Sequence, residues 1–181
     1  AGTLLGVDFG ISRQYIDKID PFATLVNPEI LPRNLPKRKR TANKYTVGQG
    51  MIIAGSAHMP GAAILASKAA LRSGIGIARL FYQEGAEGEM ALLPPEVIRQ
   101  PFSIAVLEQE LPRTKELLVG TGLGRDPKVK ELLDKIYATI NIPIVIDGDA
   151  LFFFETIKTS AILTPHRGEL QHLLRMQSPA D

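Results

Sequence analysis

The amino-acid sequence predicts an α/β fold with a mainly parallel β-sheet flanked by helices. From residue 51 onward, short apolar runs alternate with longer segments of helix-forming composition. This alternation is typical of strand–helix–strand units, which build parallel sheets. The runs are continuously apolar, as expected for strands that are buried on both faces of a sheet.

The length of 181 residues and the hydrophobic content of 45% suit one globular domain, or part of a larger one. The chain has no Cys, which excludes disulfide frameworks, thiolate metal sites and cysteine nucleophiles. This composition favours a reducing compartment, and we expect a cytoplasmic protein. The longest nearly uncharged stretch, residues 45–67, is too polar and too rich in Gly to cross a bilayer, so no membrane association is expected.

Residues 1–45 carry four prolines and no sustained hydrophobic period, which predicts an extended arm with at most one short helix. Six of the 21 basic residues lie within residues 31–45, where there is no acidic residue. A solvated linker is the favoured interpretation of this cluster, ahead of a loop that binds an anionic ligand. Nucleic acid is the least favoured partner, because aromatic residues are nearly absent around the cluster.

The first predicted strand covers residues 51–54, a short apolar run between two glycines. A helix follows from Pro60, whose missing N–H costs nothing in a first turn, and Gly74 ends it. Residues 75–82 form the next predicted strand, and so short a strand–helix–strand unit implies a right-handed parallel crossover. Beyond them the sequence predicts strands at 117–119, 142–146 and 161–163 and helices at 127–140 and 169–176.

Four polar or Gly-rich segments follow predicted strands, at residues 55–62, 120–124, 147–150 and 164–169. Ligands of open parallel sheets bind outside the carboxyl ends of the strands, so these segments are candidates for a binding site. Gly-rich turns let backbone N–H groups approach an anion, and the dipole of the helix that starts at Pro60 favours phosphate. The GxGxG pattern at 120–124 is a weak signal alone, because it also suits an ordinary strand–helix connection.

Acidic and imidazole side chains of these segments have both functional and structural interpretations. Asp147 and Asp149 suit a magnesium ion or a ligand hydroxyl, and equally an N-cap or a turn. His166 suits a donor to phosphate or carbonyl, or a structural hydrogen bond. Glu169 suits the first turn of a helix, where a carboxylate complements the dipole. The other two histidines, His58 and His172, are expected in a loop and on a helix surface without a functional role.

Several reaction classes lack their motifs in this sequence. There is no HxxxH spacing for a metal and no serine in a GxSxG turn, which leaves hydrolase chemistry unsupported. The GxGxxG fingerprint of dinucleotide-binding dehydrogenases is also absent, so a redox dehydrogenase is disfavoured.

Taken in order, the strand-end segments resemble the ADP/ATP-dependent NAD(P)H-hydrate dehydratase family, a branch of the ribokinase-like superfamily. The resemblance extends from about residue 44 to residue 174. It departs from the family pattern at Thr121, Gly148 and Arg167, where Pro, Ala and often Pro are usual. The opening GVDFGIS at 6–12 resembles the connector behind an upstream epimerase domain in bifunctional members. The matching segments are GSAHMPGAAILASKAALRSGIG (55–76), LLPPEVI (92–98), VGTGLG (119–124), IPIVIDGDAL (142–151) and AILTPHRGEL (161–170).

The resemblance implies a ribokinase-like fold and a lyase that repairs hydrated NADH or NADPH with ADP or ATP as co-substrate and Mg²⁺. Phosphoryl transfer to the hydroxyl of the hydrate would be followed by elimination. By position, Ala62, Gly122 and His166 would bind the hydrated dinucleotide. Phosphate or magnesium surroundings are implied more weakly for Gly124, Asp149 and Glu169.

In this family the general base is the Asp of a GTGD motif, which is not found within residues 1–181. The resemblance therefore implies an arm at 1–45 behind an epimerase domain and, at 46–181, the N-terminal and central part of an incomplete dehydratase domain. An isolated chain of this extent is expected to be inactive, and the family tendency to assemble leads us to expect a homo-oligomer. Two alternatives stay open: a ribokinase-like kinase of a vitamin or sugar alcohol, and a non-catalytic module that binds nucleotides or a protein.

Overall fold

The computed structural model describes residues 3, 5–7, 10–20, 22–23, 25–26, 28, 31 and 35–177. The chain divides into two compact units, residues 1–38 and residues 39–181. The first unit contains the short helix α1 (Arg13–Ile16), which buries no side chain. The segment 6–12, which resembles a connector, includes Asp8 and Phe9, and these two residues lie outside the described part of the chain.

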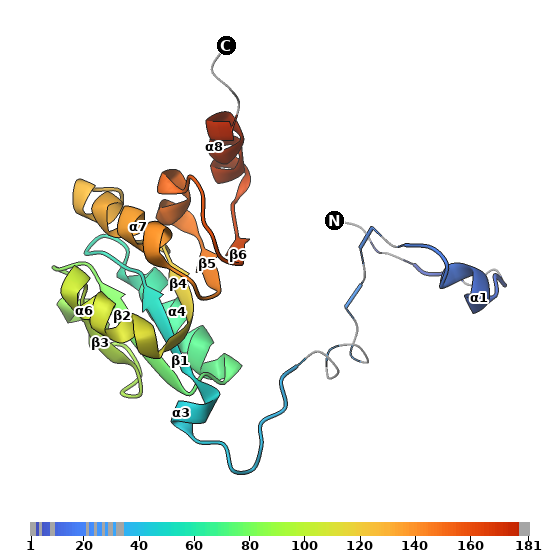
Figure 1. Cartoon of the computed structure of the whole chain (residues 1–181), viewed down its shortest axis with the longest axis horizontal. Coiled ribbons are helices and arrows are strands. Elements are labelled where there is room, and N and C mark those ends of the chain that lie inside the picture. The colour runs from blue at the N-terminus through green and yellow to red at the C-terminus, as the bar shows by residue number, and fades with distance from the viewer. Residues whose placement is uncertain are drawn as a thin grey trace. The chain divides into compact units, whose positions relative to one another are not determined.

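The second unit is built on a six-stranded sheet in the order β3-β2-β1-β4-β5-β6 (Figure 1). All five pairings are parallel, which confirms the predicted sheet. Because all strands run in the same direction, their carboxyl ends lie at the same edge of the sheet. The strands are β1 (Gln49–Ile53), β2 (Ile77–Tyr82), β3 (Ile98–Pro101), β4 (Thr114–Val119), β5 (Ile144–Ile146) and β6 (Ala161–Leu163).

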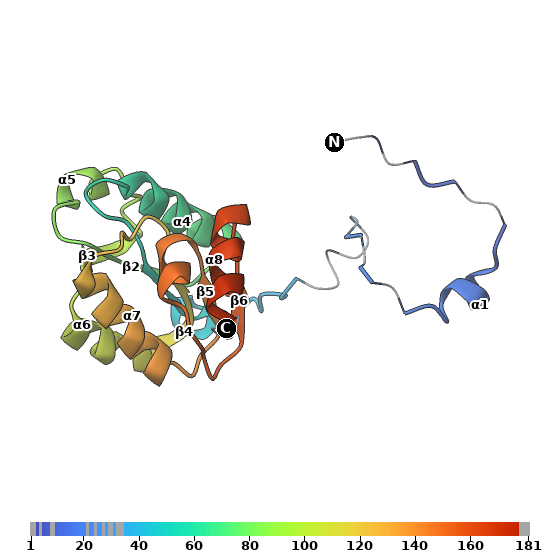
Figure 2. The same cartoon turned by 90° about the horizontal axis from the view of Figure 1, so that it is seen from above.

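Helices cover both faces of this sheet (Figure 2). Helices α4 and α5 lie on one side, and α6 and α7 lie on the other. No helix in the described part of the chain combines the length and apolar character needed to cross a membrane. The helical elements of this unit are α3 (Lys44–Val47), α4 (Pro60–Ser73), α5 (Glu87–Met90), α6 (Ile104–Glu110), η1 (Leu111–Arg113), α7 (Pro127–Thr139), η2 (Gly148–Phe153) and α8 (Arg167–Gln177).

Residues 51–53 of the central strand β1 show why the predicted apolar run is continuous. Met51 and Ile53 point into the core beneath α7, whereas Ile52 packs with Ala63 of α4 on the opposite face. Successive side chains of a strand alternate between the two faces of the sheet. A strand that helices cover on both faces therefore favours apolar residues at successive positions. The small side chain of Ala63, which is fully buried, lets α4 approach the sheet closely.

The predicted elements are confirmed, with shifts of a few residues at their ends. Helix α4 begins at Pro60 and ends at Gly74, whose φ of 94° is the left-handed conformation that terminates a helix. The sequence does not predict α3, α5, β3, α6, η1 or η2. Strand β3 lies at the outer edge of the sheet and is partly exposed, so it lacks the apolar run of a buried strand.

A buried tyrosine connects α7 to η2. The hydroxyl of Tyr137 donates a hydrogen bond of 3.0 Å to the carbonyl oxygen of Ala150. Its ring packs edge-on against Phe154, with 5.7 Å between the ring centres. Burial, and to a lesser extent the charge of Asp134, raises the pKa of the Tyr137 phenol above its ordinary value. The phenol therefore resists ionisation while the protein is folded.

We expect Tyr137→Phe to lower the free energy of unfolding by about 1 kcal/mol at neutral pH, because the buried carbonyl of Ala150 loses its donor. A phenol whose pKa is raised by folding stabilises the folded state fully below the unfolded pKa of about 10, and this contribution is lost as the pH rises further. The free energy of unfolding should therefore fall above pH 10 less steeply in the variant. Urea titrations at about pH 8 and about pH 11 measure both effects. If the free energy of unfolding fell by the same amount between these two pH values in both proteins, the prediction would be contradicted.

Candidate functional site

The strand order reverses between β1 and β4, because β2 extends the sheet in one direction and β4 in the other. Such a reversal opens a crevice at the carboxyl edge where ligands of doubly wound sheets bind. The loop 54–59 after β1 and the loop 120–126 after β4 border this point. These loops contain part of the predicted site.

Ala62 and Gly122 meet at this position. Gly122 has a φ of 62°, and a Cβ atom there would lie 2.8 Å from the carbonyl oxygen of Met59 and 3.0 Å from the Cβ atom of Ala62. Only Gly lets the loop come so close to the first turn of α4. A hydrogen bond of 3.0 Å from the N–H of Gly55 to the oxygen of Thr121 holds the two loops together.

The N-terminus of α4 has no side-chain cap. Its N-cap residue, Met59, accepts no hydrogen bond through its side chain, and Pro60 occupies the first turn. Backbone N–H groups in the first turn of a helix lack partners within the helix and attract anions. This end of α4, with Gly122 against it, suits a phosphorylated ligand.

The loops after β4 and β5 are packed just as closely. A Cβ atom at Gly120, whose φ is 116°, would overlap the carbonyl oxygen of Asp147 and lie 2.5 Å from the Cβ atom of Ala150. Gly148, one of the departures from the family pattern, has a φ of 56°. This left-handed conformation is unstrained for Gly. Gly120 and Gly148 together allow η2 to lie directly against the 120–124 loop.

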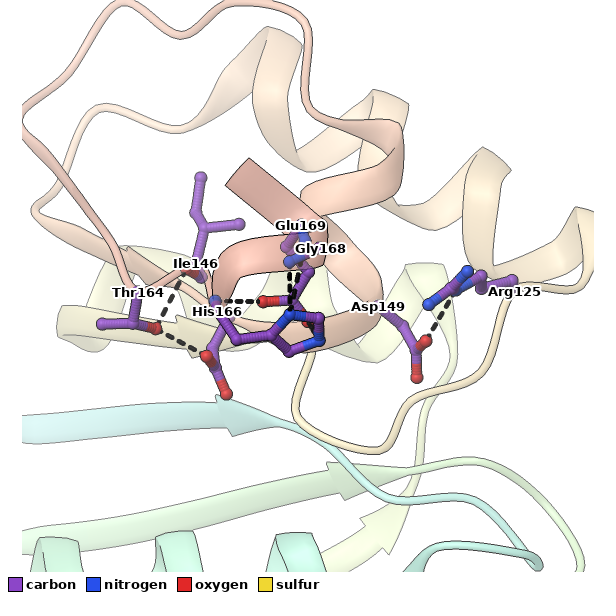
Figure 3. A network of polar contacts seen from close by, with 8 residues as sticks. Arg125, Ile146, Asp149, Thr164, His166, Gly168 and Glu169 are labelled. Atoms are coloured by element: carbon purple, nitrogen blue, oxygen red, sulfur yellow. Dashed lines mark hydrogen bonds and ion pairs between the residues drawn. The ribbon is translucent and has the colours of Figure 1, made fainter. Parts of the chain in front are cut away.

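Asp149 holds this loop through both carboxylate oxygens. Its Oδ2 atom accepts a hydrogen bond of 2.9 Å from the N–H of Gly124, and its Oδ1 atom accepts one of 2.8 Å from Nε of Arg125. Figure 3 shows the side chains of Asp149 and Arg125 pointing toward one another. Asp149 thus makes contacts of the turn-stabilising kind, and its place near phosphate or magnesium stays a prediction.

Asp147 links the loops after β5 and β6. Its Oδ1 atom accepts a hydrogen bond of 2.6 Å from the hydroxyl of Thr164, the residue after β6. Among the described residues, no group of three His, Asp or Glu side chains gathers where it could hold a metal ion. The carboxylates of Asp147 and Asp149 instead join neighbouring loops. The described residues therefore form no protein cage for Mg²⁺.

His166 caps helix α8. Its Nδ1 atom accepts hydrogen bonds from the N–H groups of Gly168, at 3.0 Å, and Glu169, at 3.3 Å. In return, Oε2 of Glu169 accepts a hydrogen bond of 2.8 Å from the N–H of His166. This reciprocal pattern is a capping box in which His replaces the usual Ser or Thr. Because Nδ1 accepts, the proton of the neutral ring is assigned to Nε2.

The two side chains of this capping box differ in solvent exposure. The side chain of His166 is 73% exposed at the carboxyl edge, whereas that of Glu169 is 7% exposed and lies with Oε1 3.2 Å from Nε2 of His166. The carboxylate of Glu169 is thus engaged within the protein, as expected for a first-turn residue. Of these two side chains, the imidazole of His166 is the one open to a ligand.

The predicted site residues form three local pairs at one edge of the sheet. Ala62 lies against Gly122, Gly124 is bound by Asp149, and His166 is bound by Glu169. The pairs come from four segments, made of loops and the first turns of helices, and each segment follows the carboxyl end of a parallel strand. The other histidines differ from one another: His58 is exposed, and His172 packs on Phe152, with 4.7 Å between the ring centres.

Solved structures with a similar fold include a ribokinase-like superfamily protein from Enterococcus faecalis. It superposes with a TM-score of 0.75 at 24% identity, over 84% of this chain and 58% of that one. An ADP/ATP-dependent NAD(P)H-hydrate dehydratase from Bacillus subtilis, co-crystallised with ATP/Mg²⁺, gives a TM-score of 0.67 at 27% identity, over 80% of this chain and 53% of that one. These neighbours confirm the ribokinase-like fold.

Two curated relatives carry related names. A bifunctional NAD(P)H-hydrate repair enzyme from Moorella thermoacetica is 27% identical over 96% of this chain and 36% of its own length. An ATP-dependent (S)-NAD(P)H-hydrate dehydratase from Ixodes scapularis is 35% identical over 83% of this chain and 50% of its own length. The chain thus spans half or less of these relatives. The model of the NAD(P)H-hydrate dehydratase family matches residues 50–179, which include the whole sheet except Gln49 at the start of β1. The chain belongs to the NAD(P)H-hydrate dehydratase family.

Proposed function

We propose that the protein containing these residues is a nucleotide-dependent lyase that restores NADH or NADPH from their hydrated forms. The observation that carries this proposal is the contact between Gly122 and Ala62 at the uncapped N-terminus of α4. That place combines small side chains, which admit a ligand close to the backbone, with N–H groups that attract phosphate. A dinucleotide offers both phosphate and flat rings to such a surface.

The three predicted substrate residues have different tasks in this proposal. Ala62 and Gly122 give the dinucleotide close access to the backbone at the end of α4. His166 supplies a hydrogen-bond donor at Nε2, because its Nδ1 is occupied by the cap of α8. A ligand oxygen would share this N–H with Oε1 of Glu169, which lies 3.2 Å from Nε2. The ring is mostly exposed, so a bound ligand can reach it without a change in the fold.

We further propose ADP or ATP as co-substrate, as in the names of the relatives, and Mg²⁺ with it, as in the crystals of the Bacillus subtilis neighbour. The terminal phosphoryl group is transferred to the hydroxyl oxygen of the hydrate, and the hydroxyl proton is released. The bond between the ring carbon and the phosphorylated oxygen then breaks, and inorganic phosphate leaves. A proton is lost from the neighbouring carbon, and the C=C bond of NADH or NADPH forms. When bound, the metal would lower the charge on the phosphates that it contacts.

The test is an assay of the full product of the reading frame that encodes these residues, with hydrated NADH and either ADP or ATP. We expect the absorbance of NADH to return and one phosphate to be released for each NADH formed. No turnover with either nucleotide would refute the proposal. A stable phosphorylated product without NADH would instead indicate a ribokinase-like kinase, and binding without any product would indicate a non-catalytic module.

A further inference from the structure

Arg125, the residue after the 120–124 loop, is held on two sides. Its Nε–H donates a hydrogen bond of 2.8 Å to Oδ1 of Asp149. The central carbon of its guanidinium group lies 3.2 Å from the centre of the Phe152 ring. Stacking on a ring and a hydrogen bond in the guanidinium plane together fix both the position and the orientation of that plane. Arg125 is therefore ordered although it belongs to a surface loop.

These contacts do not use the two Nη groups of Arg125. Within residues 35–177 and the described part of the arm, no protein atom accepts a hydrogen bond from them. The side chain of Arg125 is 50% exposed, whereas that of Asp149 is 13% exposed. The fork of Nη donors is thus available to a ligand, while the carboxylate that orients it is mostly buried.

The pairing with Asp149 does not have the form of a purely structural ion pair. Two parallel hydrogen bonds between guanidinium and carboxylate are the strongest arrangement of such a pair. Here the second carboxylate oxygen, Oδ2, is taken by the N–H of Gly124, and only Nε of Arg125 is bound. The arrangement preserves the four Nη–H donors, which match two oxygens of one phosphate group.

The place of Arg125 relates it to the proposed dinucleotide site. Asp149 binds both Gly124 and Arg125, so it connects the guanidinium to the Gly-rich loop. Arg125 lies three positions after Gly122, and three Cα–Cα steps span at most about 11 Å. Arg125 therefore lies within the length of a dinucleotide from the end of α4.

We infer that Arg125, oriented by Asp149 and Phe152, binds a phosphate group of the dinucleotide substrate through its two Nη groups. The inference rests on the proposed function. The shared chemistry is a phosphate oxyanion, which is present in the pyrophosphate of both hydrates and, in addition, on the adenosine ribose of the NADPH form. Asp149 and Phe152 are positioning residues, because they act on the ligand only through Arg125.

The test compares Arg125→Ala and Arg125→Lys with Lys128→Ala in the full gene product. Lys128 is an exposed cation of the next helix, α7, and its removal changes the net charge equally. We expect Arg125→Ala to raise the KM for hydrated dinucleotide about 10- to 100-fold with little change in kcat, since a hydrogen bond to a charged group is lost. Arg125→Lys should recover only part of this loss, because an ammonium group is a single-point donor. Lys128→Ala should stay within about 2-fold, as expected for a screened surface charge.

The choice of ligand identifies the phosphate that is bound. Equal losses for hydrated NADH and hydrated NADPH assign the pyrophosphate, and a loss confined to hydrated NADPH assigns the ribose phosphate; both support the inference. A loss confined to the KM for ATP or ADP overturns it, as does an Arg125→Ala variant that matches the unchanged protein or Lys128→Ala. If the unchanged protein itself converts neither hydrate, the proposed function fails, which is a different result. Thermal unfolding of each variant verifies that the fold is retained.

Discussion

Gly120→Ala is expected to lower the free energy of unfolding by about 2–5 kcal/mol, a large part of the stability of an ordinary domain. The φ of 116° alone costs an alanine about 1–2 kcal/mol. The new Cβ atom would also overlap the carbonyl oxygen of Asp147 and lie 2.9 Å from the backbone N of Ala150. Backbone atoms cannot turn away as a side chain can, so the loops after β4 and β5 must separate.

Gly85→Ala is the matched control for this substitution. Gly85 has a similar φ of 93°, but a Cβ atom there would meet only the Cβ atom of Ala57, at an ordinary contact distance of 3.6 Å. The difference between the two variants in urea unfolding therefore isolates the overlap from the backbone strain. Equal losses of stability in the two variants would show that η2 is not packed against Gly120 as described.

The sheet was predictable because its evidence in the sequence is local. Strand β1 is covered on both faces, so its residues 51–53 are all apolar, and this run can be recognised without knowing its neighbours. Pro60 and Gly74 mark the two ends of α4 by their own backbone chemistry. Strand β3 gives no such signal, because an edge strand such as Ile98–Pro101 is partly exposed and includes Arg99.

The tasks of the polar residues were less predictable, because they depend on partners far along the chain. Asp149 binds Gly124 and Arg125, which lie 25 and 24 residues earlier. Its sequence neighbours suit a magnesium ligand and a loop contact equally well, so the sequence left both interpretations open. Arg125 had not been singled out at all. Its only local signal is its place directly after the Gly-rich loop, and the contact with Phe152 appears only in the folded chain.

His166 can be tested for two roles at once, because the cap uses one ring nitrogen and the proposed ligand contact uses the other. We expect His166→Ala to lose about 1 kcal/mol of stability, since the N–H groups of Gly168 and Glu169 lose their acceptor. We expect His166→Asn to keep that stability, because Asn is among the best N-cap residues. Urea unfolding of both variants measures this difference.

Both substitutions remove the Nε2 donor, and both should therefore raise the KM for hydrated dinucleotide about 10-fold or more, the effect of losing one hydrogen bond to a charged ligand. The Asn variant is the decisive one, because its stability should match that of the unchanged protein while its affinity for hydrated dinucleotide should be lower. A His166→Asn variant with unchanged KM would show that the imidazole only caps α8. The ring is 73% exposed at the carboxyl edge where the dinucleotide is proposed to bind, and a ligand oxygen there competes with Oε1 of Glu169, 3.2 Å away, for the Nε2 proton, so a loss of affinity is the expected outcome.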